Sequence, residues 1–361
     1  MEHPSFVKQV MLRFQDSFKP LHEDLSAALL TPDKHLWVGS DETTTLERLT
    51  FDDTTYTFTN HQHIDLGQFI ELPAGKDEEI DIEGLAYADY YLWLVGSHSW
   101  KRKKPKEEKK EQKNVERLAT VASEKNRYLL ARIPLVNGEL FKSCPHPENP
   151  NEQLTAANLK FTERGNSLMD ALDLDPHLHP FILAEIPSKD NGFDIEGILV
   201  SGGKLFIGMR GPVLRGWAII LELEIEASNP TTLKLKEIEN TGKLYKKHFV
   251  KLNGLGIRDL CLDGQDLLIL AGPTMDLDGP VKIFRLPNGF NALGKSLSWE
   301  PEPILDLPYG KGNHHAEGIT LFDPIFQQPS ILVVYDSPSP TTHLEGATVL
   351  ADIFLLNDAQ C

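Results

Sequence analysis

The sequence lacks several of the patterns on which common protein functions depend. Only three of its 361 residues are cysteines, and no two of them form a CxxC pair; they are Cys144, Cys261 and Cys361. This spacing supports neither a disulfide framework nor a thiolate zinc site. Glycine-rich phosphate loops of the GxGxxG and Walker types, the HExxH zinc motif and a nucleophile elbow are also missing.

Positive charge and long apolar runs are scarce as well. The chain has 36 Lys and Arg residues against 53 Asp and Glu residues, a formal net charge of −17. Such a field repels nucleic acids and anionic lipid surfaces and favours cationic ligands. No apolar stretch approaches the roughly 18 residues of a membrane span, and residues 1–14 lack the pattern of a signal peptide. We therefore expect a soluble cytoplasmic protein with no nucleic-acid or membrane partner.

What the sequence does contain is a recurring phrase built around Ile-Glu-Gly. The copies are DIEGLAY at 81–87, DIEGILV at 194–200, HAEGITL at 315–321 and the weaker GIRDLCL at 256–262 and DLSAALL at 24–30. Each copy is followed by a turn and a second apolar run, such as LWLVGS at 92–97. Further short apolar runs follow, separated by Gly, Pro, Asn and Lys-rich connectors, which is typical of antiparallel strands.

The spacing of the phrase predicts the fold. Its central residues are 57, 113, 62 and 59 residues apart and are Ser26, Glu83, Glu196, Arg258 and Glu317. Four-stranded units of this length, repeated around an axis, are typical of a β-propeller. The sequence thus predicts an all-β fold, a single propeller domain over residues 1–361 with five four-stranded blades. The 113-residue interval leaves six blades as the alternative.

The two ends of the chain are expected to meet in one blade. The last unit shows three strands, ending at 351–356, and the run VKQVMLRF at 7–14 precedes the first phrase as a fourth strand would. Pairing this N-terminal strand with the last blade would close the ring and remove exposed sheet edges.

Two segments account for most of the long interval. Residues 99–125 form a mixed-charge run within the second blade, which we interpret as a flexible, solvated insertion, although a basic arm is the alternative. Residues 166–175 (NSLMDALDLD) have the apolar pattern of a short helix.

Polar residues should gather at one rim of the central channel. The first strand of each blade lines the channel and the second runs antiparallel to it, so the start of one lies beside the end of the other. This places Glu83, Glu196 and Glu317 near Asp41, Ser97, Arg210, Arg258 and Asp336, with Asp24, Asp81, Asp194, His98, His314 and His315 close by. Crowded carboxylates repel one another unless a hard cation such as Ca²⁺ or an arginine neutralises them. Alternatively, the Glu-Gly pair could be architectural, with glycine permitting a bend and Glu capping backbone amides of the next blade.

These phrases resemble the bacterial family that carries domain of unknown function 3616, a member of the β-propeller superfamily. The resemblance lies in DIEGLAY with LWLVGSHS, in PSKDNGFDIEGI continuing to GMRGP, in IRDL with LLILAGP, and in HAEGI. It spans the chain from about residue 24 to the end and implies a propeller without an assigned reaction. A more distant similarity is to esterase-like phytase domains. In regucalcin and gluconolactonase propellers, a strand also begins with Glu-Gly and its glutamate binds a divalent metal. That similarity implies Glu83, Glu196 and Glu317 as metal ligands.

Two hypotheses about function follow. In the first, the rim hydrolyses a phosphoester, lactone or ester: a divalent cation such as Ca²⁺ on the three glutamates polarises the substrate, and Arg210 and Arg258 hold its anionic part. His98 or His315 serves as general base, and Asp41, Ser97 and Asp336 contact the substrate. In the second, the rim is a non-catalytic module that binds a small molecule or a protein partner, and the arginines neutralise the carboxylates internally.

Overall fold

The computed structural model describes residues 6–15, 24–239, 241–289, 293, 296–298, 301–311, 314–337, 343–344 and 347–356. Cys361 lies outside these ranges, whereas Cys144 and Cys261 are both partly buried free thiols. None of the described helices is long and apolar enough to cross a membrane.

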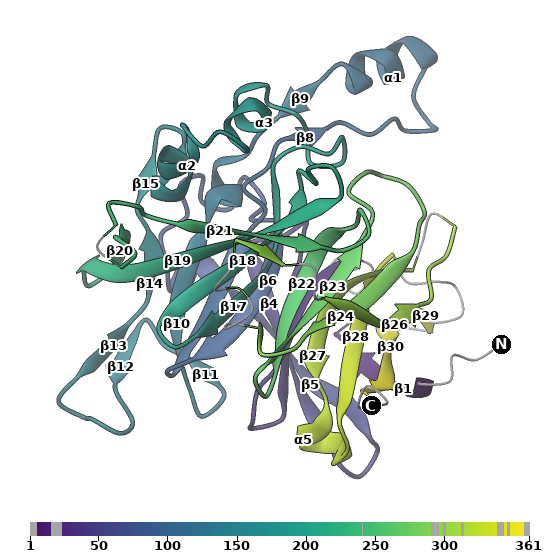
Figure 1. Cartoon of the computed structure of the whole chain (residues 1–361). Helices are drawn as coiled ribbons and strands as arrows, with labels where there is room; N and C mark the ends of the chain where they lie inside the picture. Colours follow the sequence, from purple (N-terminus) through teal and green to yellow (C-terminus); the bar gives the residue numbers. More distant parts are fainter. Residues whose placement is uncertain are drawn as a thin grey trace.

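Each of the five phrases begins a group of antiparallel strands (Figure 1). The first group is β2 (Leu25–Leu30), β3 (His35–Ser40), β4 (Thr45–Asp52) and β5 (Thr57–Asp65). The second is β6 (Ile82–Ala88), β7 (Tyr91–Gly96), β10 (Leu130–Val136) and β14 (Ala157–Leu159). The third is β17 (Asp194–Ser201), β18 (Lys204–Gly211) and β19 (Trp217–Asn229), with β20 (Thr232–Lys236) and β21 (Lys246–Lys251) both paired to β19. The fourth is β22 (Gly256–Asp263), β23 (Asp266–Gly272), β24 (Val281–Leu286) and β26 (Glu302–Leu307).

The last group is completed by the beginning of the chain. It contains β27 (His315–Leu321), β28 (Ser330–Asp336) and β30 (Thr348–Leu355), and β30 pairs antiparallel with β1 (Phe6–Arg13). β1 also pairs in parallel with β5, and this pairing joins the first and last groups in one sheet. The predicted closure by the N-terminal strand is therefore confirmed.

The first strands of the groups form a closed ring. β6 packs against β2 and β17, β22 against β17 and β27, and β27 against β2. The apolar core is divided accordingly into clusters that each lie between neighbouring groups. This division follows from the alternation of side chains along each strand. In β7, Leu92 and Leu94 face the first group, whereas Trp93 and Val95 face the third. The all-β propeller prediction is confirmed, and the number of blades stays a prediction.

Shorter strands and helices lie in the segments that connect or flank these groups. They are β8 (Lys101–Arg102), α1 (Glu111–Leu118), β9 (Val121–Ala122), η3 (Lys125–Tyr128), β11 (Glu139–Leu140), β12 (Ser143–Pro145), β13 (Gln153–Thr155), β15 (Phe161–Thr162), β16 (Gly165–Asn166), α2 (Ser167–Leu172), α3 (His179–Leu183), η2 (Leu66–Gln68), β25 (Leu297–Ser298), α5 (Asp323–Phe326) and β29 (His343–Leu344). The predicted helix within 166–175 corresponds to α2, which the Asn166 side chain caps by accepting from the amides of Leu168 and Met169.

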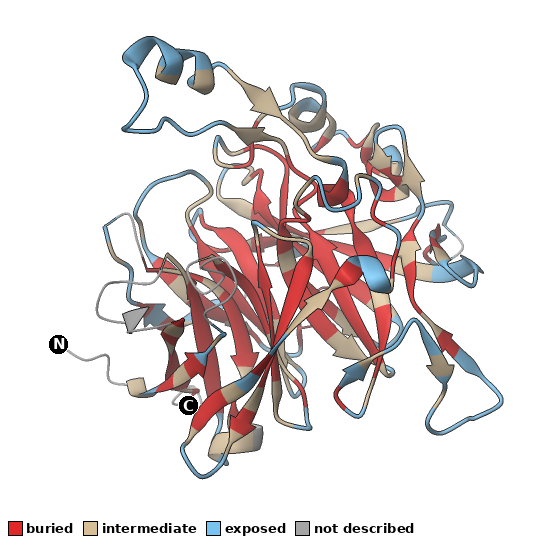
Figure 2. Cartoon of the chain, turned by 180° about the vertical axis from the view of Figure 1, so that it is seen from behind, coloured by how far each residue is buried: buried red, intermediate tan, exposed pale blue. Residues whose placement is uncertain are grey.

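The charged segment 99–125 forms an arm. β8 and β9 pair as a short ladder, and α1 at its tip projects away from the ring and buries none of its residues (Figures 1 and 2). Its interpretation as a flexible insertion stays a prediction.

Candidate functional site at the mouth of the channel

The central residue of each phrase is the extra residue of a β-bulge. In β6, Ile82 pairs with Gly96 and Gly84 with Val95, so Glu83 has no partner of its own. The same skip occurs at Ser26, Arg258 and Glu317, and in β17 it includes Glu196. A bulge interrupts the alternation of side chains and re-aims the extra residue. The repeated phrase is therefore a device that brings five polar side chains together where the inner strands begin.

The glycine of the phrase permits neighbouring inner strands to approach. A Cβ on Gly84 would lie 2.8 Å from the backbone nitrogen of Ile198, and one on Gly318 would lie 2.8 Å from that of Ala28. The fourth group has Asp259 in place of this glycine, and its buried carboxylate accepts hydrogen bonds from the amides of Leu260 and Ile319. The amide-capping role considered for the glutamates is thus carried out by Asp259.

Two arginines bind two of the three motif glutamates. The Arg210 guanidinium donates to Glu196 over 2.8 Å. Arg258 donates to both carboxylate oxygens of Glu317 and to the carbonyl of Pro273, and its Nη1 lies 3.5 Å from Glu196. Glu196 and Arg258 are both buried. This arrangement is the arginine neutralisation that the sequence left open as an alternative to a metal.

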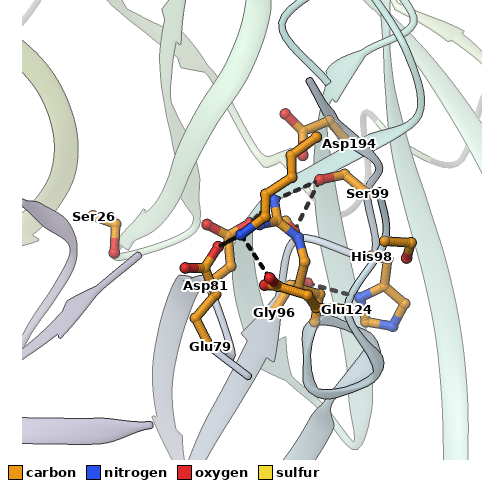
Figure 3. A network of polar contacts seen from close by, with 12 residues as sticks. Ser26, Glu79, Asp81, Gly96, His98, Ser99, Glu124 and Asp194 are labelled. Carbon is orange, nitrogen blue, oxygen red and sulfur yellow. Dashed lines mark hydrogen bonds and ion pairs between the residues drawn. The ribbon is translucent and has the colours of Figure 1, made fainter. Parts of the chain in front are cut away.

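A third arginine, Arg127, was missed by the sequence analysis. It forms an ion pair with Asp81, lies 2.9 Å from Glu79 and donates to Ser99 Oγ over 2.9 Å. Figure 3 shows Asp81, Glu79 and Ser99 gathered in this network, with Asp194 nearby. Arg127 comes shortly before β10, at the rim where β7 ends. Its position before a third strand was the available signal, but the preceding charged segment obscured it.

Glu83 differs from the other two motif glutamates because no cation pairs with it. Within the described part of the chain, no ion pair is formed by Glu83 or by Asp41. Burial, and next the charges of Asp81, Glu196 and Asp194, raise the pKa of Glu83 well above its usual value. Burial, followed by Asp81 and Asp336, raises the pKa of Asp41 to about 8.

Two further observations show an excess of negative charge. Asp194 Oδ1 and Glu196 Oε2 are buried without a hydrogen-bond partner. Burial, and then Glu317, raise the pKa of Asp336. We name this set the rim cluster: Asp41, Asp81, Glu83, Asp194, Glu196, Glu317 and Asp336, with Arg127, Arg210 and Arg258. Its carboxyl groups outnumber its guanidinium groups.

Lys189 is a second residue that the sequence analysis missed. Its charge lowers the pKa of both Asp41 and Asp336, although desolvation outweighs it in each case. It lines a small cleft together with Arg210, Arg258, Glu317, Asp336, His315 and Tyr309. This cleft brings together five of the predicted site residues from three groups of strands.

The predicted residues His98 and Ser97 are both buried. His98 Nδ1 donates to the Gly96 carbonyl and its Nε2 accepts from Asn166 Nδ2, both over 2.7 Å. Burial lowers the pKa of His98 to about 4. No ring nitrogen is left to serve a substrate, so the geometry assigns His98 a structural role. Ser97 is fully buried, and its Oγ accepts from Ser99 Oγ.

His315 remains available as a polar group of the cleft. It is half-buried, and its Nε2 lies 3.7 Å from Asp278. His314, its neighbour, is buried and stacks on Tyr335 at a ring distance of 3.9 Å. Burial lowers the pKa of His314.

The three motif glutamates do not fit a shared divalent cation as they stand. Arg210 and Arg258 form ion pairs with Glu196 and Glu317. In the residues that the structure describes, no group of three or more His, Cys, Asp or Glu side chains is arranged to hold a metal. The metal site, with Ca²⁺ as its expected ion, stays a prediction to which this arrangement gives no support.

Comparison with known families agrees with the strand arrangement. A family model described as "Protein of unknown function (DUF3616)" matches residues 24–352. The chain belongs to this family. The resemblance identified from the repeated phrases is thereby confirmed, and membership in the DUF3616 family brings no reaction with it. No curated protein matches the chain.

Solved structures similar to this DUF3616 chain are distant. A streptogramin B lyase is 9% identical with a TM-score of 0.38, and the match covers 98% of this chain and 100% of that one. A virginiamycin B lyase from Staphylococcus aureus is 9% identical with a TM-score of 0.36, covering 97% and 100%. A glucose dehydrogenase is 12% identical with a TM-score of 0.39, covering 93% and 82%. Likeness at this level says nothing about this chain's activity.

Proposed function

We propose that the protein is a ligand-binding propeller whose rim cluster takes a small organic cation, an amine or a guanidine. The observation that carries this proposal is Glu83, a half-buried carboxylate with four other carboxyl groups around it and no ion pair among the described residues. Concentrated carboxylates attract a cation because it removes their mutual repulsion and the cost of desolvating their charge.

The distribution of hydrogen-bond partners favours a cation over an anion. The terminal nitrogens of Arg210, Arg258 and Arg127 donate to protein acceptors, and the Nε of each is a buried donor without a partner. An anionic substrate would have to displace the ion pairs that the terminal nitrogens form, and the seven carboxyl groups of the rim cluster outnumber its three guanidinium groups. Asp194 Oδ1 is a buried acceptor without a hydrogen bond, and Glu196 Oε2 has Arg258 Nη1 at 3.5 Å but no hydrogen bond. An ammonium or guanidinium group supplies donors to such oxygens, and charge-assisted bonds of this kind are the stronger ones.

The same distribution favours an organic cation over a metal ion. A hard divalent ion needs six or more oxygen ligands in a compact shell, whereas guanidinium groups stand between Glu196 and Glu317. Metal-assisted hydrolysis also needs a free general base. His98 cannot serve as one, because both of its ring nitrogens are already hydrogen-bonded. Hydrolysis of a phosphoester, lactone or ester therefore stays a prediction, with His315 as its remaining histidine.

The proposal is tested by thermal unfolding of chelator-stripped protein with putrescine, agmatine, Ca²⁺, Mg²⁺, Mn²⁺ and Zn²⁺. A ligand at about 100 times its dissociation constant adds roughly 2.7 kcal/mol to the native state, which raises the melting temperature by a few degrees. We expect this increase with at least one organic cation and its loss in Glu83→Gln. The matched control is Glu226→Gln, which removes an exposed carboxylate paired with Lys234 far along β19.

Two outcomes would contradict the proposal. If no organic cation raises the melting temperature, or if Glu83→Gln responds as wild type does, the rim cluster is not the binding site. If a metal ion alone raises it and Glu83→Gln abolishes the effect, metal-assisted hydrolysis becomes the leading interpretation.

A further inference from the structure

A second cavity lies at the base of the charged arm, outside the rim cluster. Its volume is about 770 Å³, within the range of small-molecule sites. We name it the arm pocket. Its apolar walls come from the base of the arm, η3, β15, α2 and α3 and are Trp100, Tyr128, Phe161, Met169, Ile182 and Leu183.

The wall formed by Tyr128 is held in place from several sides. Its hydroxyl lies 2.9 Å from Ser123 Oγ, and the His98 ring meets it edge-on at 5.7 Å. Gly165 packs so closely on the ring that a Cβ there would lie 2.3 Å from Tyr128 Cδ1. Because Tyr128 is already fixed and only 9% exposed, the part of it that lines the pocket would lose little conformational entropy on binding.

The polar groups of the arm pocket are mainly acidic. Arg164 is neutralised by Asp173, whereas neither Glu163 nor Glu185 forms an ion pair in the described residues. Glu124 Oε1 binds Lys101 over 2.8 Å, but its Oε2 is buried without a hydrogen-bond partner. Lys125 also lines the cavity and only partly balances these carboxylates.

The arm pocket and the rim cluster are built on consecutive residues. Ser99 binds Arg127 at the rim, and the next residue, Trp100, lines the pocket. Likewise Arg127 binds Asp81, and the next residue, Tyr128, faces the pocket. The two sites therefore adjoin at the second group of strands and differ in chemistry: the rim cluster is a set of carboxyl and guanidinium groups, whereas the arm pocket combines aromatic walls with acidic groups.

We propose that the arm pocket is a binding site for aromatic amines. Trp100, Tyr128 and Phe161 offer apolar faces for a ring, and ring faces also attract a nearby ammonium group. The exposed carboxylates of Glu163 and Glu185 supply acceptors for that ammonium. This ligand class is distinct from the small polar cation proposed for the rim, because it requires the three aromatic side chains that line the arm pocket.

The test uses phenethylamine as probe, with phenylacetate and n-butylamine as matched compounds, measured by titration calorimetry on the full chain. We expect phenethylamine to bind at least tenfold more tightly than either, because phenylacetate has the opposite charge and n-butylamine lacks the ring. Trp100→Ala should weaken phenethylamine binding at least tenfold. Leu297→Ala, an exposed apolar residue outside the pocket, should leave it unchanged.

A pair of variants at Leu183 protects the test against a folding artefact. Leu183 is 70% exposed at the edge of the pocket, so substitution there leaves the fold intact. Leu183→Arg should weaken phenethylamine binding severalfold by repelling its ammonium group, whereas Leu183→Glu should retain or strengthen it. Equal binding by these two variants would overturn the proposal, as would phenylacetate binding as tightly as phenethylamine.

The rim supplies the remaining control. In Glu83→Gln, which disables the rim cluster, the phenethylamine binding that remains belongs to the arm pocket and should still weaken at least tenfold when Trp100→Ala is added. If Glu83→Gln abolishes binding while Trp100→Ala does not, the amine binds at the rim, which overturns the arm pocket proposal and supports the rim proposal. If neither variant changes the binding, the arm pocket is not the site.

Discussion

Asp41 is a single residue at which burial and crowding by other carboxylates reduce the stability of the folded protein. Its pKa is raised to about 8 in the folded protein, mainly by burial, from an ordinary value of 3.8. An acid whose folded pKa is raised binds more protons in the native state, so its contribution to stability falls as pH rises from about 4 to about 8. One pKa unit of difference corresponds to ~1.4 kcal/mol.

We therefore expect Asp41→Asn to stabilise the protein at pH 8 by about 1 kcal/mol or more, and to have little effect near pH 4. Urea unfolding of both proteins at the two pH values measures this difference. A mutant less stable than wild type at pH 8 would mean that Asp41 is held by an attraction that outweighs its desolvation.

Arg258, unlike Asp41, stabilises the rim cluster, because its positive charge compensates carboxylates of two neighbouring groups of strands. It contacts Glu317 directly and Glu196 at 3.5 Å, and all three side chains are at most 12% exposed. Removing one partner of a buried ion pair costs about 3–5 kcal/mol, because the other charge is left without compensation. Arg258→Met should lose stability in this range in urea unfolding at pH 7.

Two further variants separate this ion-pair effect from lost packing. Arg258→Met combined with Glu317→Gln should cost less than the sum of the single changes. Lys234→Met breaks an exposed pair with Glu226 at 2.9 Å and should change stability by no more than about 1 kcal/mol. Strict additivity of the first pair would show that the Arg258–Glu317 contact contributes nothing.

At the scale of an element, the repeated phrase joins a bulge to a close contact between strands. The bulge residue supplies the polar group, and the following glycine admits the backbone of the next inner strand. At Gly84, an added Cβ would lie 2.8 and 2.9 Å from backbone atoms of Ile198 and Gly197, which cannot rotate away as a side chain could.

Gly84→Ala should therefore destabilise the protein by about 3 kcal/mol, the upper part of the range for overpacking. Gly202 is a useful comparison because it has a positive φ of 58° in a turn but no atom within 4 Å of an added Cβ. Gly202→Ala should cost only about 1 kcal/mol, from backbone strain alone. Chemical unfolding measures both, and equal costs would show that the strand contact at Gly84 is not the limiting feature.

The elements could be predicted because their signals are local and repeated. Apolar runs of even spacing gave the strands, and the interval between phrases gave the propeller and its closure by β1. The bulges could not be predicted, because the period-two argument assumes uninterrupted alternation. Arg127 and Lys189 come from connecting segments that have no counterpart in the other units. His98 was predicted as a base from its position in the chain, but only the structure shows Gly96 and Asn166 occupying both ring nitrogens.

At the scale of the whole molecule, the rim cluster and the net charge of −17 act in the same direction. Several buried or half-buried carboxyl groups have raised pKa values, first of all because of desolvation: Asp41, Glu83, Asp194, Glu196, Asp259 and Asp336. Each binds protons more readily in the native state, so together they make the protein gain stability as pH falls from 8. A cationic ligand at the rim would replace these protons, so it would raise the free energy of unfolding most at high pH.

The same molecule contains groups with the opposite dependence. Burial lowers the pKa of His98 from 6.5 to about 4, so below pH 6.5 the unfolded state binds this proton more readily and stability is lost. Hydrogen bonding to His248 and contact with Lys204 lower the pKa of Glu222 from 4.5 to about 2, which removes further stability below pH 4.5.

Stability in urea should therefore rise as pH falls from 8 to about 6.5 and reach its maximum between about pH 4.5 and 6.5, below the neutral range. His98→Gln, which removes the titrating ring, should extend the rise in stability to lower pH. A wild-type stability that increases from pH 6.5 to 8 would show that the rim carboxylates are neutralised in the folded protein by something other than protons. Adding the amines of the rim test at pH 8 would then be the direct way to find out whether a cation already occupies the site.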